Sequence, residues 1–198
     1  MNPRLAMQVV LSYFQAAIVL QARAKGLDCV EVSPDLERTT TEARLDTTGV
    51  HFPGGQYLDW DAVEEIQSAR NSCFLLEASG LHKIQVFSAE TDRFYSLMPT
   101  SSAPTMLISG FPMHRIKGTD PQRDTLEKIR TIQPLVGQVL DTATGLGYTA
   151  IEAARTAEHV LTVELDPAAL EMARLNPWSQ ELFDNLKISQ TIGDSYEV

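Results

Sequence analysis

The sequence is poor in cysteine. Its two cysteines, Cys29 and Cys73, lie far apart and show none of the short spacings that bind metals. A small domain held together by disulfides needs more cysteines, and a cysteine-based zinc site needs them in close pairs. Both classes are therefore excluded. We predict no metal site and expect two reduced, buried thiols.

Basic residues are scarce relative to acidic ones. The chain has 16 Lys and Arg against 26 Asp and Glu, which gives a formal net charge of -10 at pH 7. A protein that grips nucleic acid broadly by its phosphates has the opposite balance. RNA therefore stays open as a substrate through a local basic patch, but the composition does not indicate it.

Residues 5–22 form an uncharged, mostly apolar segment, and the following Ala22-Arg23-Ala24 is similar to a signal-peptidase site. A signal peptide would be uniformly apolar here, whereas polar residues recur at helical spacing: Gln8, Ser12 and Gln15. We therefore predict an amphipathic helix that ends at Gly26, with a signal peptide as the alternative. The expected location is cytoplasmic, with no membrane contact.

Short extended patterns follow from residue 27 to residue 108. They predict strands at 29–32, 36–45, 50–52, 73–77, 81–87, 94–98 and 105–109. Turn residues separate several of these segments, and Asp59 caps a short helix over residues 59–66. We therefore predict an accessory domain over residues 1–117, in which an N-terminal helix precedes mostly antiparallel β-structure.

The stretch from Val139 to Ala150 carries the main functional signal. An apolar run ends in Asp141, a loop of small residues contains Gly145 and Gly147, and a helix-forming segment follows. This order predicts a strand, a tight turn and a helix. Glycines let the backbone approach a ligand closely, and the free N–H groups of the helix start point at that ligand. The stretch therefore predicts a nucleotide-cofactor loop.

Two cofactor classes fit this loop. Gly145-x-Gly147-x-x-Ala150 matches the dinucleotide fingerprint, and Glu164 follows at about the expected distance of ~20 residues. However, Asp141 closes the strand just before the turn, where a carboxylate would repel a pyrophosphate. A ligand with an ammonium and a sulfonium group would be attracted instead, so we favour that class.

Two further predicted strands also end near acidic residues. Residues 159–164 form a buried-type strand that ends in Glu164, whose two oxygens can accept hydrogen bonds from both hydroxyls of a ribose. Asp166 and Pro167 then cap and start a helix. A third strand, near residues 186–191, leads to Asp194, whose carboxylate can accept a hydrogen bond from an adenine amino group.

Together these residues resemble a known family. Leu140-Asp141-x-Ala143-x-Gly145-x-Gly147, the tip at 163–166 and Gly193-Asp194 look like the first three motifs of class I S-adenosylmethionine-dependent methyltransferases, with Ala143 in place of the first loop glycine. The longer run from Gly147 to Ser179 is similar to a poorly characterised, mainly archaeal group of predicted methyltransferases.

The resemblance implies S-adenosylmethionine as the cofactor. Asp141, Gly145 and Gly147 would hold its methionine part, Glu164 its ribose and Asp194 its adenine. The full set of cofactor-binding residues that the resemblance implies is Asp141, Ala143, Thr144, Gly145, Gly147, Tyr148, Thr149, Glu164, Leu165, Asp194 and Ser195.

The junction between the two expected domains, residues 110–121, leads into a further helix. Asp120 and Pro121 form a cap and first-turn pair, so this helix should pack its apolar face towards the sheet, beside the cofactor loop. The substrate-side candidates are therefore His114, Arg115, Asp124 and Thr125. A hinge with solvated charges is the alternative interpretation of this junction.

Residues 118–198 thus predict a partial, doubly wound, Rossmann-like α/β sheet. Three parallel strands leave a bare hydrophobic edge. We therefore expect either a chain truncated after the third motif, or a homo-oligomer or partner chain that covers this edge. No catalytic residue is assigned, because relatives in this class grip the methyl acceptor with later strands.

The favoured function is an S-adenosylmethionine-dependent methyltransferase of unknown acceptor. An aminopropyltransferase resembling spermidine synthase would use the same loop, and an acidic cleft would suit a polyamine. A non-catalytic cofactor-binding scaffold is the third hypothesis, and a dinucleotide oxidoreductase is the last.

Overall fold

The computed structural model describes residues 8–197 and divides the chain into two compact units, residues 1–84 and 85–198. The fold class predicted from the sequence is confirmed: antiparallel sheets come first and a small parallel α/β sheet follows. The boundary between residues 117 and 118 stays a prediction of where two independently folding domains meet. In the structure, residues 85–117 belong to the same compact unit as the parallel sheet.

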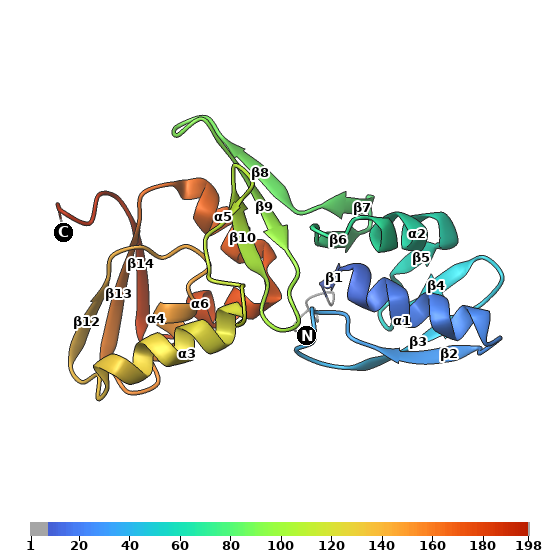
Figure 1. The fold of residues 1–198 in the computed structure, drawn as a ribbon, viewed down its shortest axis with the longest axis horizontal. Coiled ribbons are helices and arrows are strands. Elements are labelled where there is room, and N and C mark those ends of the chain that lie inside the picture. The colour runs from blue at the N-terminus through green and yellow to red at the C-terminus, as the bar shows by residue number, and fades with distance from the viewer. Residues whose placement is uncertain (1–7, 198) are drawn as a thin grey trace, which may run out of the picture. The chain divides into compact units, whose positions relative to one another are not determined.

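Within residues 8–84, the first unit consists of two antiparallel sheets and two helices that pack against each other (Figure 1). One sheet has the order β2-β3-β4-β5 and the other has the order β1-β6-β7. The elements are β1 (Val9–Leu11), α1 (Tyr13–Ala24), β2 (Cys29–Val32), β3 (Thr41–Leu45), β4 (Gly49–His51), β5 (Tyr57–Asp59), α2 (Trp60–Ser68), β6 (Phe74–Glu77) and β7 (Gly80–Lys83).

The amphipathic helix expected over residues 5–22 is wrong in its first part. Residues 5–7 lie outside the described residues, and Val9–Leu11 form β1, which is buried and pairs with β6. The helix starts only after Ser12, because Ser12 and Gln15 form a capping box in which the Gln15 side chain accepts the Ser12 N–H at 2.9 Å. Gly26, at φ +69, follows the C-cap as predicted.

Two other expectations for this region fail. The strand predicted over residues 36–45 begins only at Thr41, because Leu36 and Glu37 have positive φ values of 55° and 72°, which break an extended strand. Cys29 is exposed, whereas Cys73 is buried as expected. Cys29 is the first residue of β2, an outer strand that pairs with β3 alone among the described strands.

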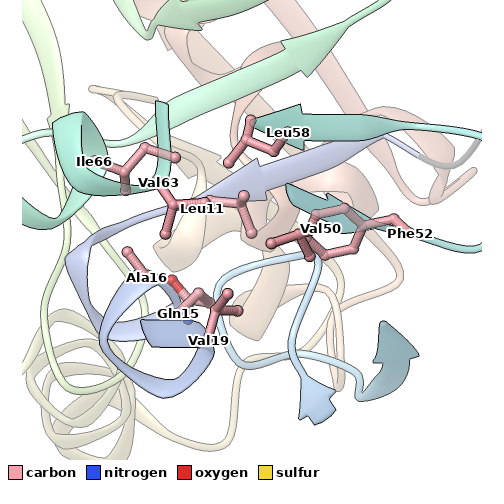
Figure 2. Close-up of a pocket in the computed structure, with 9 residues that line it drawn as sticks. All are labelled: Leu11, Gln15, Ala16, Val19, Val50, Phe52, Leu58, Val63 and Ile66. Carbon is pink, nitrogen blue, oxygen red and sulfur yellow. The ribbon is translucent and has the colours of Figure 1, made fainter. Parts of the chain in front are cut away.

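A small apolar cavity lies in the core of the first unit, between β1, α1, β4, β5 and α2 (Figure 2). Its one polar lining residue, Gln15, is hydrogen-bonded within the protein: its amide nitrogen donates to Glu37 Oε1 at 2.5 Å, and its oxygen accepts from Ser12. The cavity has room for about one water molecule. It is therefore a packing defect and not a ligand site.

Within residues 85–197, the second unit contains an antiparallel sheet of order β11-β10-β9-β8 and a parallel sheet of order β12-β13-β14 (Figure 1). Helix α5 contacts both β13 and the β8–β9 hairpin, and α3 packs against α4. The elements are β8 (Gln85–Ser88), β9 (Arg93–Met98), β10 (Thr105–Ile108), β11 (Phe111–Pro112), α3 (Pro121–Ile132), β12 (Gln138–Asp141), α4 (Tyr148–Ala153), β13 (His159–Glu164), α5 (Pro167–Leu175), the 3-10 turn η1 (Pro177–Ser179), α6 (Gln180–Asp184) and β14 (Ile188–Ile192).

One strand was expected over residues 81–87, but the structure has two. β7 ends at Lys83 and β8 starts at Gln85, and the two strands belong to different sheets in different compact units. Ile84, between them, is buried and donates its N–H to the Cys73 carbonyl at 2.9 Å. The apolar run is continuous in sequence, but its hydrogen-bonding partners change at Ile84.

The open side edge expected for the parallel sheet lies along its outer strand β12. β13 is central, and among the described strands β12 pairs with β13 alone. Large apolar side chains in β12 and in the segment leading to it are exposed: Ile132 by 58% at the end of α3, Val136 by 72% and Leu140 by 48%. Among residues 8–197, no helix has the length and apolar character needed to cross a membrane.

Candidate functional site

The glycine loop has the predicted order of strand, turn and helix, but the N–H groups expected to point at a ligand are bonded within the protein at Gly145 and Gly147. β12 ends at Asp141, the turn follows, and α4 begins at Tyr148. Gly145 has φ +52 and Gly147 has φ +77, which is the left-handed region that favours glycine. A Cβ on Gly147 would lie 2.7 Å from the Leu182 side chain, so α6 packs directly on the loop backbone. Both glycines are therefore required by the backbone of the turn.

The carboxylate of Glu164 is bonded to this loop. Gly145 N–H donates to Glu164 Oε2 at 2.8 Å, and Asp166 N–H donates to Glu164 Oε1 at 3.1 Å. The strands are parallel, so the carboxyl ends of β12 and β13 meet at one edge of the sheet. The glycine turn and the acidic tip of β13 thus form one structure, and both Glu164 oxygens are oriented by backbone donors.

Asp141 joins the same edge through threonine hydroxyls. Thr162 Oγ1 donates to Asp141 Oδ2 at 2.9 Å, and the hydroxyls of Thr162 and Thr144 lie 2.6 Å apart. Burial raises the pKa of Asp141 and the charge of Glu164 raises it further, whereas hydrogen bonds from Thr162 and the Ala143 backbone oppose the rise. Two carboxylates that repel each other therefore face this part of the loop.

The other predicted cofactor residues are exposed or half-buried near the strand tips and the loop. Ala143 is exposed and Thr149 half-buried, and Leu165 is 64% exposed beside Glu164. Asp194 is exposed after β14, where its Oδ1 accepts the Tyr196 N–H at 3.0 Å. Ser195 next to it is half-buried. The parallel order places Asp194 at the same sheet edge as Glu164, but its carboxylate hydrogen-bonds within its own turn.

Tyr148 anchors the first turn of α4. Its side chain is buried, its hydroxyl donates to the Pro104 carbonyl at 2.9 Å, and it accepts from Asn176 Nδ2 at 2.8 Å. Asn176 also donates to Ser179 Oγ at 2.7 Å, and that hydroxyl donates to the Leu146 carbonyl at 2.7 Å. Sequence reasoning missed Asn176 as a site residue. The run Asn176-Pro177-Trp178-Ser179 was the sequence signal that could have found it, because two residues of this run form these hydrogen bonds.

The substrate-side candidates divide into two pairs. His114 is half-buried and stacks on Tyr148, with ring centroids 5.2 Å apart. Burial, and then the charge of Lys128, lower the pKa of His114 to about 4, against the opposite effect of Asp124. His114 is therefore uncharged at neutral pH. Arg115, the next residue, is exposed.

Asp124 and Thr125 are buried, and each has a polar contact within α3. Asp124 forms an ion pair with Lys128 at 2.7 Å, and Thr125 Oγ1 donates to the Pro121 carbonyl at 2.8 Å. Helix α3 packs against α4, so these residues support the helix that follows the loop. The ion pair of Asp124 and the hydrogen bond of Thr125 favour a role in holding α3.

A further contact at the loop comes from Met113. A Cβ built on Gly145 would lie 2.2 Å from Met113 Cε, so the Met113 side chain rests on the glycine turn. This residue follows β11, and its N–H donates to the Met106 carbonyl at 2.9 Å. No local pattern predicts this contact, because 32 positions separate the two residues along the chain.

Comparisons with known proteins give partial structural likenesses and one relative in sequence. No family model matches it. Among solved structures, it resembles spermidine synthase from Thermotoga maritima (TM-score 0.42, 16% identity, 59% of this chain and 44% of that chain). It also resembles the tRNA m1G37 methyltransferase of M. jannaschii (TM-score 0.37, 16% identity, 94% and 54%). The chain spans about half the length of these structures or less, and the likeness is partial.

The sequence comparison is more specific. The chain is 31% identical over 200 residues to the uncharacterized protein MJ1233 of Methanocaldococcus jannaschii. The alignment covers 98% of this chain and 67% of that relative. The chain therefore belongs to the same family as the uncharacterized protein MJ1233.

Proposed function

We propose that the chain binds S-adenosylmethionine between the glycine loop and the tip of β13, and that it serves methyl transfer to an acceptor still to be identified. The observation that carries the proposal is the Glu164 carboxylate, which two backbone N–H groups hold at the mouth of the loop. Each oxygen of a carboxylate can accept more than one hydrogen bond. Glu164 is therefore oriented in advance and can still accept from both ribose hydroxyls.

The charges at the loop favour a cationic ligand. Gly145 N–H donates to Glu164 and Gly147 N–H donates to the Thr144 carbonyl at 2.7 Å, so these two amides are not directed at a ligand. A pyrophosphate would lose those donors and would face Asp141 and Glu164. A sulfonium would instead relieve the repulsion between the two carboxylates. This argues against a dinucleotide cofactor.

The remaining candidates have proposed roles around this centre. Leu165, exposed beside Glu164, offers an apolar surface to the adenine ring, and Asp194 can accept from the adenine amino group. Arg115 is exposed next to His114, and its proposed role is to pair with the methionine carboxylate. His114 is neutral, so it adds no positive charge that would repel a sulfonium.

The chemistry supplied by this cofactor is in-line displacement, in which the methyl carbon bonds to the acceptor while the carbon–sulfur electron pair returns to sulfur and leaves a neutral thioether. The chain's residues contribute mainly by orientation. Glu164 and the loop fix one reactant, and a near-attack distance of roughly 3 to 3.5 Å removes much of the entropic barrier. A proton acceptor is needed only if the acceptor group must be deprotonated.

Calorimetric titration of the chain with S-adenosylmethionine and S-adenosylhomocysteine tests the proposal. We expect micromolar binding, weakened by at least about tenfold in Glu164→Gln, because hydrogen bonds to a charged group are lost. Glu171→Gln is the matched control, since Glu171 is exposed on α5 away from the strand tip. A folded chain that binds neither ligand contradicts the proposal.

An aminopropyltransferase is the second candidate, and the occupied loop amides favour it. A decarboxylated cofactor has no carboxylate that needs those donors, and the acidic loop would also suit a polyamine. Incubation with decarboxylated S-adenosylmethionine and putrescine distinguishes the two activities. Spermidine formation supports the second candidate, whereas its absence together with S-adenosylmethionine binding supports the first.

We also propose that a second copy or another chain covers the open edge at β12, where Ile132, Val136 and Leu140 are exposed. Soluble proteins normally cover such an edge. Light scattering after size-exclusion chromatography should therefore show a dimer or larger species. A monomer that stays in solution at high concentration contradicts this proposal, and would leave a scaffold role without support.

A further inference from the structure

A buried carboxylate lies next to the proposed site. Asp166 is 4% exposed and accepts four hydrogen bonds. Oδ1 accepts from Ser88 Oγ and from Ala168 N–H, both at 2.9 Å. Oδ2 accepts from Thr91 Oγ1 at 2.5 Å and from Tyr95 OH at 2.7 Å. Three of the four donors are hydroxyls of the β8–β9 hairpin, which is more than 70 positions away in the sequence.

The same residue also contacts the proposed ribose acceptor. The Asp166 backbone N–H donates to Glu164 Oε1, and the other oxygen of Glu164 accepts from Gly145. Two carboxylates, those of Asp166 and Glu164, therefore link the hairpin and the start of α5 to the tip of β13 and the glycine loop. A displacement of Asp166 would move one of the two donors that orient Glu164.

Helix capping alone does not explain this cluster. Asp120 occupies the same Asp-Pro pattern at the start of α3, and its side chain caps the helix by accepting one backbone N–H, from Arg123, at 3.0 Å. Asp166 also caps its helix through one backbone N–H, that of Ala168, and accepts three hydroxyls in addition. Burial alone would raise the pKa of Asp166, but the hydroxyl and backbone donors outweigh it and lower the pKa. The cluster thus holds an ionised carboxylate in the interior.

We propose that Asp166 is a positioning residue, through which Ser88, Thr91 and Tyr95 of the β8–β9 hairpin hold Glu164 in place for the ribose. This inference rests on the proposed function. It assigns the hairpin to the cofactor site, although none of its residues belongs to the glycine loop or to the strand tips.

The test removes the donors one at a time, because Asp166→Ala removes four hydrogen bonds and can unfold the chain. Tyr95→Phe and Thr91→Val each delete one hydroxyl with little change of shape. We expect each to weaken S-adenosylhomocysteine binding by about five- to tenfold, a typical effect for one bond to a charged group. Asp120→Ala removes only a helix cap and should change the affinity by less than about twofold.

A double-mutant cycle separates positioning from general loosening of the fold. In a Glu164→Gln background, Tyr95→Phe should weaken binding by less than about twofold, because the group being positioned is already altered. Equal losses in both backgrounds would overturn the inference.

A measurement without ligand keeps the inference distinct from the proposed function. The Gly145 amide proton bonds to Glu164, so its NMR resonance should move upfield and its hydrogen exchange should accelerate in Tyr95→Phe and Thr91→Val, but not in Asp120→Ala. An unchanged Gly145 amide in both hairpin variants overturns the link. If the wild-type chain binds no ligand while the Gly145 amide responds, the proposed function fails and the link between hairpin and Glu164 stands.

Discussion

Replacing Gly147 with alanine should destabilise the second unit strongly, for two separable reasons. The residue has φ +77, where an L-residue with a Cβ is strained by roughly 1–2 kcal/mol. The new methyl group would also lie 2.7 Å from Leu182 Cδ2 and 2.9 Å from Cδ1. Leu182 is fully buried in α6. Forcing an extra carbon into such a core costs roughly 1–3 kcal/mol more.

The total is therefore about 2–5 kcal/mol. Gly118→Ala is the matched control, because Gly118 has φ +74 and nothing lies within 4 Å of the position of its Cβ. This control has the backbone strain without the steric clash, so we expect it to lower the free energy of unfolding by roughly 1–2 kcal/mol. The difference between the two variants isolates the packing of Leu182 on the loop.

Urea unfolding in a Trp60→Phe background provides the assay. The chain has two tryptophans, so Trp178 then reports alone, and it lies in the turn that leads into α6. We expect the midpoint of Gly147→Ala to lie well below that of Gly118→Ala, with similar slopes. Equal midpoints would refute the argument, because they would show that α6 yields without cost.

Three further predictions concern other groups. Since the pKa of Asp166 is lowered on folding, its stabilisation should be complete above about pH 4 and disappear as the pH falls further, which Tyr95 fluorescence or amide exchange in the hairpin can follow. Asp141 has a raised pKa, so the stability of the wild-type chain should decline as the pH rises from about 4 through that pKa. Urea titrations at several pH values should show that Asp141→Asn removes this decline. The same variant should weaken binding of the sulfonium ligand. Val63→Ile extends a side chain that lines the cavity of the first unit (Figure 2), so calorimetry should show a stabilisation of up to about 0.8 kcal/mol. A loss of stability would mean that the cavity cannot accept one methylene.

Local signals in the sequence predicted the elements around the site well. Asp120-Pro121 and Asp166-Pro167 begin α3 and α5 as expected, because a capping carboxylate and a proline fix the start of a helix without help from distant residues. The glycine turn before α4 follows the same logic. The acids at the tips of β12 and β13 come together because parallel strands end on one edge, so their side chains could be placed from order alone.

Long-range pairing could not be predicted in this way. The apolar residues before Ser12 fit the period of a helix, whereas pairing with β6 makes Val9–Leu11 a strand. The capping box of Ser12 and Gln15 was the local signal that marks the true start of α1. Likewise, nothing local shows that an apolar run changes sheets at Ile84.

The same limit applies to the site. Met113 on Gly145, Asn176 on Tyr148 and the hairpin hydroxyls on Asp166 are contacts between segments that are distant in the chain. The sequence indicated Asp166 only as a helix cap, because a cap is recognised from its immediate neighbours. Its three additional donors depend on where the antiparallel sheet packs on α5.

The hydroxyl cluster around Asp166 also determines how this protein can be divided for laboratory work. A fragment that starts at residue 118, where the composition suggests a natural cut, would leave out Ser88, Thr91 and Tyr95 and leave a carboxylate without most of its donors. Such a fragment should express poorly or precipitate, even though it retains every motif residue. A fragment that starts at residue 85 keeps the donors and is the shorter version that should remain folded.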